Sequence, residues 1–198
     1  DNVLQDFIEN APNEIIKAKY SAYRERSIGL GVMGFHSLLQ SKMIPFESVT
    51  AKVLNIFIFK HIKQEADLAS KKLASERGSC PDAEEIGIQE RFSNKIAIAP
   101  TASISIICGG SSPGIEPYPA TIYTHKTLSG SFTVRNKYLN KLFEDKGLNL
   151  KIMWEKILND EGSVQNLEEL TPLEKDVFKN AFEIDQRYII EFAADRTP

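Results

Sequence analysis

Apolar side chains recur at helical spacing along much of the chain. In the longest such segment, from Glu47 to Arg77, they lie near one stripe of a helix, and the segment ends at Gly78, a residue type that commonly follows the last helical turn. The stripe consists of Val53, Leu54, Phe57, Ile58, Ile62, Ala66, Ala69 and Leu73. At roughly 3.6 residues per turn, this pattern predicts a helix of about eight turns.

Further helices are predicted in the C-terminal third of the chain. Two of them, over Asn136–Lys146 and Asn149–Asp160, are each closed by a following glycine. The segment Thr171-Pro172-Leu173-Glu174 then combines an N-cap residue, a proline at the first helical position and a capping-box glutamate. It predicts the start of a helix that reaches about Ala194.

The middle of the chain has a different pattern. Glycines alternate with apolar residues over Ser27–Gly34, which allows close backbone approach, and Phe35–Leu39 then turns helical. The run Ile96–Ala99 is too short for a helix and has no polar face, so it predicts a strand buried on both sides, as in a parallel sheet or barrel. A short helix is expected from Pro100 through Cys108. The predicted fold class is therefore helix-rich α/β.

Both ends of the sequence suggest a piece of something longer. Val3, Leu4, Phe7 and Ile8 have the spacing expected for the last turns of an amphipathic helix that begins before residue 1. At the other end, Asp195–Pro198 follows directly on a helical pattern. We therefore expect residues 1–198 to be a single interior segment of one domain.

Composition excludes several classes of protein. The 198 residues are 42% hydrophobic and 26% charged, as in ordinary globular domains, and 24 Lys and Arg against 27 Asp and Glu do not indicate a nucleic-acid-binding surface. The longest apolar runs, such as Leu54–Phe59, are far shorter than the roughly 20 residues that span a bilayer. The first residues lack the pattern of a signal peptide, so we expect a cytoplasmic protein with no membrane segment.

The junction at Ala99–Ser105 is the strongest local indication of a binding site. A buried strand would pass there into a helix that begins with small and hydroxyl-bearing residues, and the first N–H groups of a helix have no partner within it. Such a junction suits a phosphate group, because the small side chains of residues 101–103 let an anion approach the backbone and the hydroxyls of Thr101 and Ser103 could donate to it. The alternative is that Thr101 is only the N-cap of the helix.

Several motifs give the sequence a resemblance to the large, catalytic subunits of class I-like ribonucleotide reductases. The segment Ala99–Ser105, followed by Gly109–Pro117, resembles the phosphate-binding region of that family. Three other segments agree in order and spacing: Arg26–His36, Ile122–Phe132 and Ala193–Pro198. The resemblance covers essentially the whole chain.

This resemblance implies that the chain is part of the family's ten-stranded α/β barrel. It also implies a site for a ribonucleoside diphosphate, held mostly by backbone amides, whose residues are Pro100, Thr101, Ala102, Ser103 and Ile104. In the family, a thiyl radical on a finger-loop cysteine abstracts the 3′ hydrogen, an Asn and a Glu assist, and two further cysteines supply reducing equivalents. None of these residues can be matched to a position here, so no catalytic residue and no metal ligand is assigned to this segment.

The resemblance also implies the partners of the parent enzyme. They are the remainder of the large subunit, a small radical-generating subunit, most naturally with a diiron-tyrosyl centre, and a thioredoxin-like reductant. A cobalamin-dependent parent is the alternative radical source. A second interpretation of the chain is a stand-alone diphosphate-binding or interaction module without catalysis.

Other conspicuous residues are interpreted as structural. Cys80 and Cys108 are the only cysteines and fit neither a metal-ligand spacing nor a disulfide framework. We expect Cys80 to lie in a loop and Cys108 to pack as a small hydrophobic residue. His36 is expected to be a hydrogen-bonded core residue, Glu116 to stabilise a turn, and the six tyrosines to pack, since none is adjacent to another.

Overall fold

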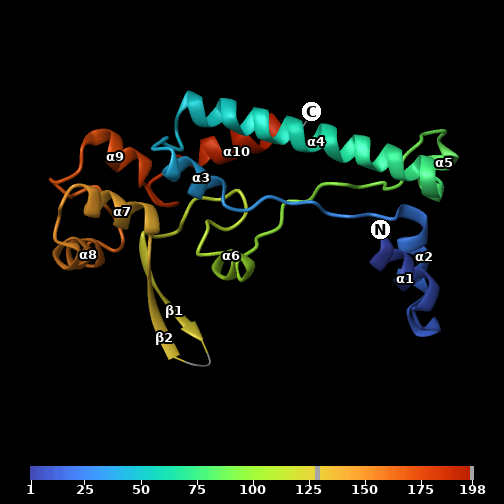
Figure 1. Cartoon of the computed structure of the whole chain (residues 1–198), viewed down its shortest axis with the longest axis horizontal. Helices are drawn as coiled ribbons and strands as arrows, with labels where there is room; N and C mark the ends of the chain where they lie inside the picture. The colour runs from blue at the N-terminus through green and yellow to red at the C-terminus, as the bar shows by residue number, and fades with distance from the viewer. Residues whose placement is uncertain (128–129, 197–198) are drawn as a thin grey trace. The chain divides into compact units, whose positions relative to one another are not determined.

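A computed structural model describes residues 1–127 and 130–196 (Figure 1). Two of the motifs therefore include residues outside the described part, namely residues 128–129 of the motif at 122–132 and residues 197–198 of the C-terminal motif. The chain forms two compact units. Unit 1 consists of residues 1–31 and 58–98, and unit 2 of residues 32–57 and 99–198.

Unit 1 is mostly helical. It contains α1 (Asn2–Asn10), the 3-10 helix η1 (Asn13–Ile15), α2 (Ile16–Glu25), most of α4 (Val49–Arg77) and α5 (Pro81–Glu85). Its charged centre is the carboxylate of Asp1, whose oxygens lie 2.9 Å from Arg26 Nη2, 2.8 Å from Arg77 Nη1 and 3.1 Å from Arg91 Nε. The side chains of Asp1, Arg26 and Arg91 are almost completely buried, so this cluster links α1 to the end of α4 and to the segment that follows α5.

The strand predicted at 96–99 was only partly correct. Ile96 forms a single parallel bridge with Leu30, and the N–H of Leu30 donates to Lys95 O while the N–H of Ala97 donates to Leu30 O. The prediction of burial on both sides is wrong for this chain, because Ile96 is 38% and Ile98 54% exposed. A strand is buried on both faces only when other elements pack against both faces, and the described residues leave Ile96 and Ile98 partly uncovered.

The long helix is confirmed as α4, which ends before Gly78. The predicted apolar stripe is wrong in detail, because Val53 is 59% and Phe57 70% exposed. The buried positions are rotated from it and include polar residues: Ala51, Asn55, Phe59, Ser70 and Ala74. Hydrogen-bonding partners explain the difference, since Asn55 Nδ2 donates to Phe192 O and Ser70 Oγ accepts from the N–H of Arg91.

Unit 2 contains the main apolar core. Its first helix is α3 (Phe35–Ser41), and the predicted helices at 136–146 and 149–160 are confirmed as α7 (Lys137–Asp145) and α8 (Leu150–Asn159). Asn136 caps α7 by accepting two backbone N–H groups of its first turn, and Asn149 caps α8 by accepting the N–H of Ile152. The core packs these two helices against the segments that follow them, through Ile122, Leu139, Phe143, Met153, Trp154, Ile157, Val164, Leu167, Leu170, Val177 and Phe178.

The capping box at Thr171 and Glu174 is confirmed, but the single helix predicted to follow it is wrong. Helix α9 covers only Pro172–Val177, and a separate helix α10 covers Gln186–Arg196. Between them Asn180 forms its own turn, because its Oδ1 accepts from the N–H of Phe182 and its N–H donates to Glu183 Oε2. Side chains that bond to nearby backbone groups compete with helix formation, and this competition ends α9 early.

A β-hairpin completes unit 2. Strands β1 (Ile122–Thr127) and β2 (Gly130–Arg135) pair antiparallel, with Ile122 opposite Arg135 and Thr127 opposite Gly130, and the hairpin projects away from the helices of this unit (Figure 1). It is the one two-stranded sheet in the described residues. Most of the elements in the described residues are helices, so the prediction of a helix-rich fold is confirmed. Within the same residues, no helix is long and apolar enough to cross a bilayer.

The close approach of the two paired segments in unit 1 leads to a testable prediction. A Cβ placed on Gly29 would lie 2.9 Å from Ala97 Cβ, closer than carbon atoms tolerate. Gly29→Ala should therefore lower the free energy of unfolding by about 1–3 kcal/mol, as for overpacking at other tight sites. Adding Ala97→Gly to the same chain should restore part of this loss, measured by chemical denaturation of the four members of the cycle. Strict additivity of the two effects would show that the contact does not constrain the backbone.

Candidate functional site

The loop that follows residue 98 has an unusual backbone. Thr101 has φ 50°, in the left-handed region that β-branched residues rarely adopt, and its carbonyl oxygen accepts the N–H of Ser105 at 2.9 Å. Helix α6 covers only Ile104–Ile107, with Ser103 as its N-cap. The predicted helix start at Pro100 is therefore wrong, because the left-handed residue interrupts the helix, and Thr101 is not the N-cap.

The site residues predicted from sequence lie together on the open side of this loop. Ala102, Ser103 and Ile104 are exposed and Thr101 is half-buried. Within the part of the chain that the structure describes, the backbone N–H groups of residues 101–104 donate no hydrogen bond. Four successive amide donors are thus available to a ligand at the start of a short helix. The side chains of these residues are not large polar groups that could occupy the donors.

The loop is held in this shape by the returning segment, residues 109–118, which follows α6. The N–H of Gly114 donates to Thr101 Oγ1 at 2.7 Å, which leaves the hydroxyl hydrogen of Thr101 available to a ligand. Gly114 has φ 51°, and a Cβ there would lie 2.8 Å from Ala99 O. Only glycine fits at this position. Sequence reasoning did not single out Gly114, although its place in the Gly109–Pro117 motif was a signal.

His36 in α3 contacts the same returning segment. It is fully buried, and its Nδ1 accepts the N–H of Tyr118 at 3.0 Å, which confirms the prediction of a hydrogen-bonded core histidine. Because Nδ1 is an acceptor, the proton of the neutral ring is on Nε2. Burial lowers the pKa of His36 to about 3, against a weaker opposing effect of a backbone hydrogen bond to Val177.

The other residues singled out in the sequence have mixed outcomes. Cys80 precedes α5 as expected and is fully buried, but the prediction that Cys108 packs as a hydrophobic residue is wrong, because it is exposed at the end of α6. A helix of four residues leaves its last position little to pack against. Packing is also wrong for Tyr20 and Tyr23, which are 63% and 51% exposed, whereas Tyr118 is buried. Glu116 is exposed at a turn in which its N–H donates to Pro113 O.

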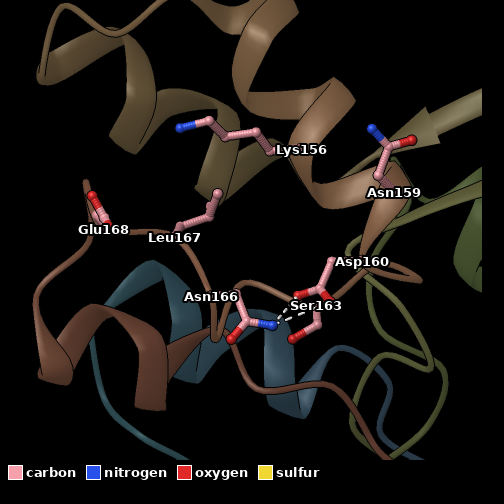
Figure 2. A pocket seen from close by; sticks show the side chains of 7 residues that line it. All are labelled: Lys156, Asn159, Asp160, Ser163, Asn166, Leu167 and Glu168. Carbon is pink, nitrogen blue, oxygen red and sulfur yellow. Dashed lines mark hydrogen bonds between the residues drawn. The ribbon is translucent and has the colours of Figure 1, made fainter.

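A hollow of about 530 Å³ lies elsewhere in unit 2, between the end of α8 and the loop that follows it (Figure 2). Several of its polar side chains already bond to neighbours: Asn166 Nδ2 donates to both carboxylate oxygens of Asp160, and Lys156 pairs with Glu169. No residue of the 100–104 loop lines it. Among the described residues there is also no cluster of His, Cys, Asp or Glu that could hold a metal ion. The loop at 100–104 is therefore the better candidate site.

An exposed row of backbone donors that follows a short parallel-paired segment is an arrangement through which α/β proteins can bind anionic groups. Comparison with known proteins identifies the family. The model of the ribonucleotide reductase barrel domain matches residues 2–94 and 82–198, so this chain belongs to the ribonucleotide reductase barrel-domain family.

Individual relatives agree with this assignment. The ribonucleoside-diphosphate reductase large subunit of Invertebrate iridescent virus 6 is 49% identical over 99% of this chain, and the vitamin B12-dependent ribonucleoside-diphosphate reductase of Thermoplasma acidophilum is 35% identical over 93% of it. The solved class Id ribonucleotide reductase alpha subunit of Actinobacillus ureae superposes with a TM-score of 0.88 at 39% identity over 98% of the chain. The chain spans 21%, 24% and 35% of these three proteins, respectively.

The buried histidine makes stability depend on pH. In the unfolded chain His36 titrates near 6.5, and in the folded chain near 3, so the folded state favours the neutral ring. The contribution of neutral His36 to the free energy of unfolding is present above pH 6.5 and is lost as pH falls from 6.5 towards 3. In this window the imidazole ring binds a proton in the unfolded chain but not in the folded chain. The melting temperature should fall over this window, and His36→Asn, which keeps an acceptor but does not titrate, should show a smaller fall. Parallel curves for the two proteins would contradict the assignment.

Proposed function

We propose that this chain is part of the large subunit of a ribonucleoside-diphosphate reductase and that it holds the phosphates of the ribonucleotide substrate. Pro100, Thr101, Ala102, Ser103 and Ile104 would form the binding loop. The observation that carries this proposal is the row of four unused N–H groups at residues 101–104. Membership in the family supports the reaction, the reduction of ribonucleotides to deoxyribonucleotides.

The physical basis is the match between donors and charge. A diphosphate presents several anionic oxygens, and hydrogen bonds from neutral amides to charged acceptors are roughly twice as strong as neutral ones. The exposed Ala102 leaves room for these oxygens to reach the backbone, and the hydroxyl of Thr101 can donate while it accepts the N–H of Gly114. Because every donor is held by the loop before the ligand arrives, little ordering is required on binding.

The barrel and the radical chemistry are proposals about the parent enzyme. We propose that residues 1–198 form one segment of the ten-stranded barrel, which agrees with the exposed apolar side chains of Ile96 and Ile98, since the barrel interior or the surrounding helices would cover them. A thiyl radical and a pair of reducing cysteines would come from other parts of the subunit. Cys80 and Cys108 are both free thiols, in keeping with a reducing, cytoplasmic location.

The radical source would also lie outside this segment. The described residues hold no metal-binding cluster, so a diiron-tyrosyl centre does not fit here and would belong to a separate small subunit. Cobalamin is the alternative, supported by the B12-dependent relative. A thioredoxin-like protein would regenerate the reducing cysteines after each turnover.

Substitutions in the loop test the proposed phosphate site. In the complete large subunit, Ala102→Trp should block the diphosphate sterically, and Ala102→Pro should remove a donor; both should weaken binding of a ribonucleoside diphosphate strongly. Ser103→Ala deletes one exposed hydroxyl and should cost on the order of 1 kcal/mol, or about twice that if it bonds a charged oxygen. Thr101→Val should cost more than Ser103→Ala, because it also leaves the N–H of Gly114 without its acceptor.

Equilibrium dialysis of radiolabelled cytidine diphosphate would measure these affinities, with circular dichroism as the control for folding. Ala102 is exposed, so the tryptophan side chain would have room outside the core, whereas Ala102→Pro also restricts the backbone and needs the folding control most. Unchanged affinity in folded Ala102→Trp and Ala102→Pro proteins would show that the phosphates bind elsewhere.

The two cysteines provide a separate prediction. Cys80 is completely buried and Cys108 lies at the end of α6, and neither belongs to a family cysteine motif. The double variant Cys80→Ala/Cys108→Ser in the complete enzyme should therefore retain its turnover within about twofold, less than 0.5 kcal/mol in activation free energy. Loss of dithiol-dependent turnover in a folded double variant would instead give one of these thiols a redox role.

A further inference from the structure

Buried hydroxyl groups join the returning segment of the loop to the start of α3. The N–H of Ser112 donates to Ser37 Oγ at 2.7 Å, and the N–H of Ser37 donates to Ser112 Oγ at 3.1 Å. Ser37 is 4% exposed and Ser112 is completely buried. This reciprocal pair is reinforced by the N–H of Gly34, which donates to Ser112 O at 2.9 Å. The segment is thus fixed to α3 at one point.

Tyr118 connects this pair to the glycines after α6. Its hydroxyl donates to Gly110 O at 2.8 Å and lies 2.6 Å from Ser37 Oγ. Since the single hydroxyl hydrogen of Tyr118 goes to Gly110, the Ser37 hydroxyl must donate to the Tyr118 oxygen while it accepts the N–H of Ser112. Burial raises the pKa of Tyr118 to about 12, so its hydroxyl stays protonated and keeps this role at neutral pH.

These bonds lead to the phosphate loop through Gly114. This glycine lies between Ser112 and Tyr118 in the chain, and its N–H donates to Thr101 Oγ1. A left-handed threonine is a strained conformation that persists only where its surroundings hold it. If residues 110–114 were free to move, Thr101 could relax, and the loop that leaves the N–H groups of residues 101–104 without partners among the described residues would change shape.

We propose that Tyr118 is a positioning residue for the substrate's diphosphate. Together with Ser37 and Ser112, its hydroxyl holds residues 110–114 in the place from which Gly114 fixes Thr101. The inference rests on the proposed function of the loop. It assigns the tyrosine a task in binding phosphate although it touches no substrate atom.

The test uses Tyr118→Phe in the complete large subunit. This variant keeps the ring and loses both bonds of the hydroxyl, so the dissociation constant for cytidine diphosphate should rise by about tenfold, the consequence of losing about one net hydrogen bond. Binding of cytidine, which lacks phosphates and is measured as a competitor, should change by less than about twofold. In turnover assays, the KM for the diphosphate should rise while kcat at saturation stays near that of the parent enzyme, as for lost uniform binding.

Two further variants complete the experiment. Ser112→Ala, which removes one half of the reciprocal pair, should change the same constants in the same direction. Tyr188→Phe is the matched control, because the Tyr188 ring packs edge-on against Phe192 in α10 and its hydroxyl makes no hydrogen bond within residues 1–127 and 130–196. It should bind both ligands as the parent does.

The outcomes separate this inference from the proposed function. If Ala102→Trp abolishes diphosphate binding but folded Tyr118→Phe and Ser112→Ala bind normally, the phosphate site stands and the positioning role is overturned. An equal loss of cytidine and diphosphate binding would also overturn it, since that indicates general loosening. If Ala102→Trp binds normally, the proposed function itself fails. Should Tyr118→Phe not fold, the Ser112→Ala result decides the question.

Discussion

The hydrogen bond from the N–H of Gly114 to Thr101 Oγ1 is the contact on which the candidate site depends. It joins two parts of unit 2 that lie 13 residues apart in sequence, and it holds a β-branched residue in a left-handed conformation. Without that conformation a helix could begin at Pro100, and the N–H groups of Ser103 and Ile104 would then bond to the carbonyl oxygens of Ala99 and Pro100. The strained residue thus keeps them available to a ligand.

The proposed site would depend on the geometry of backbone donors and not on charged side chains. Backbone donors that are fixed before binding lose little conformational freedom when the anion arrives, and they cannot be titrated. They also perform no chemistry. A loop of this kind suits an enzyme in which phosphate binding orients a substrate while the reacting groups come from other parts of the protein.

Buried polar groups in unit 2 are used as connectors. His36, Ser37, Ser112 and Tyr118 are all nearly inaccessible to solvent, and each has its hydrogen-bonding capacity met by a neighbour. Such networks are costly if any member is missing, because an unpaired polar group then remains in an apolar setting. That cost makes the position of the returning segment specific, which a purely apolar contact would not do.

The sequence alone determined the elements whose signals are local. The capping asparagines of α7 and α8, the capping box at Thr171 and the glycine after α4 act within one helical turn, so their pattern can be read without the rest of the chain. The motif from Ala99 to Ser105 likewise predicted the position of the candidate site, and the family resemblance is the basis on which a diphosphate is proposed as its ligand.

Tertiary structure decided what depends on distant partners. The sequence pattern predicted burial for Phe57 and Ile98, but exposure is set by which neighbours exist, and the buried face of α4 follows Asn55 and Ser70 because the backbone at Phe192 and Arg91 lies opposite them. Nothing local marks Gly114 as the partner of Thr101, or Tyr118 as the partner of Ser37 across 81 residues. Periodicity reports one residue's preference for water, whereas a hydrogen bond between distant segments exists only once the fold has brought them together.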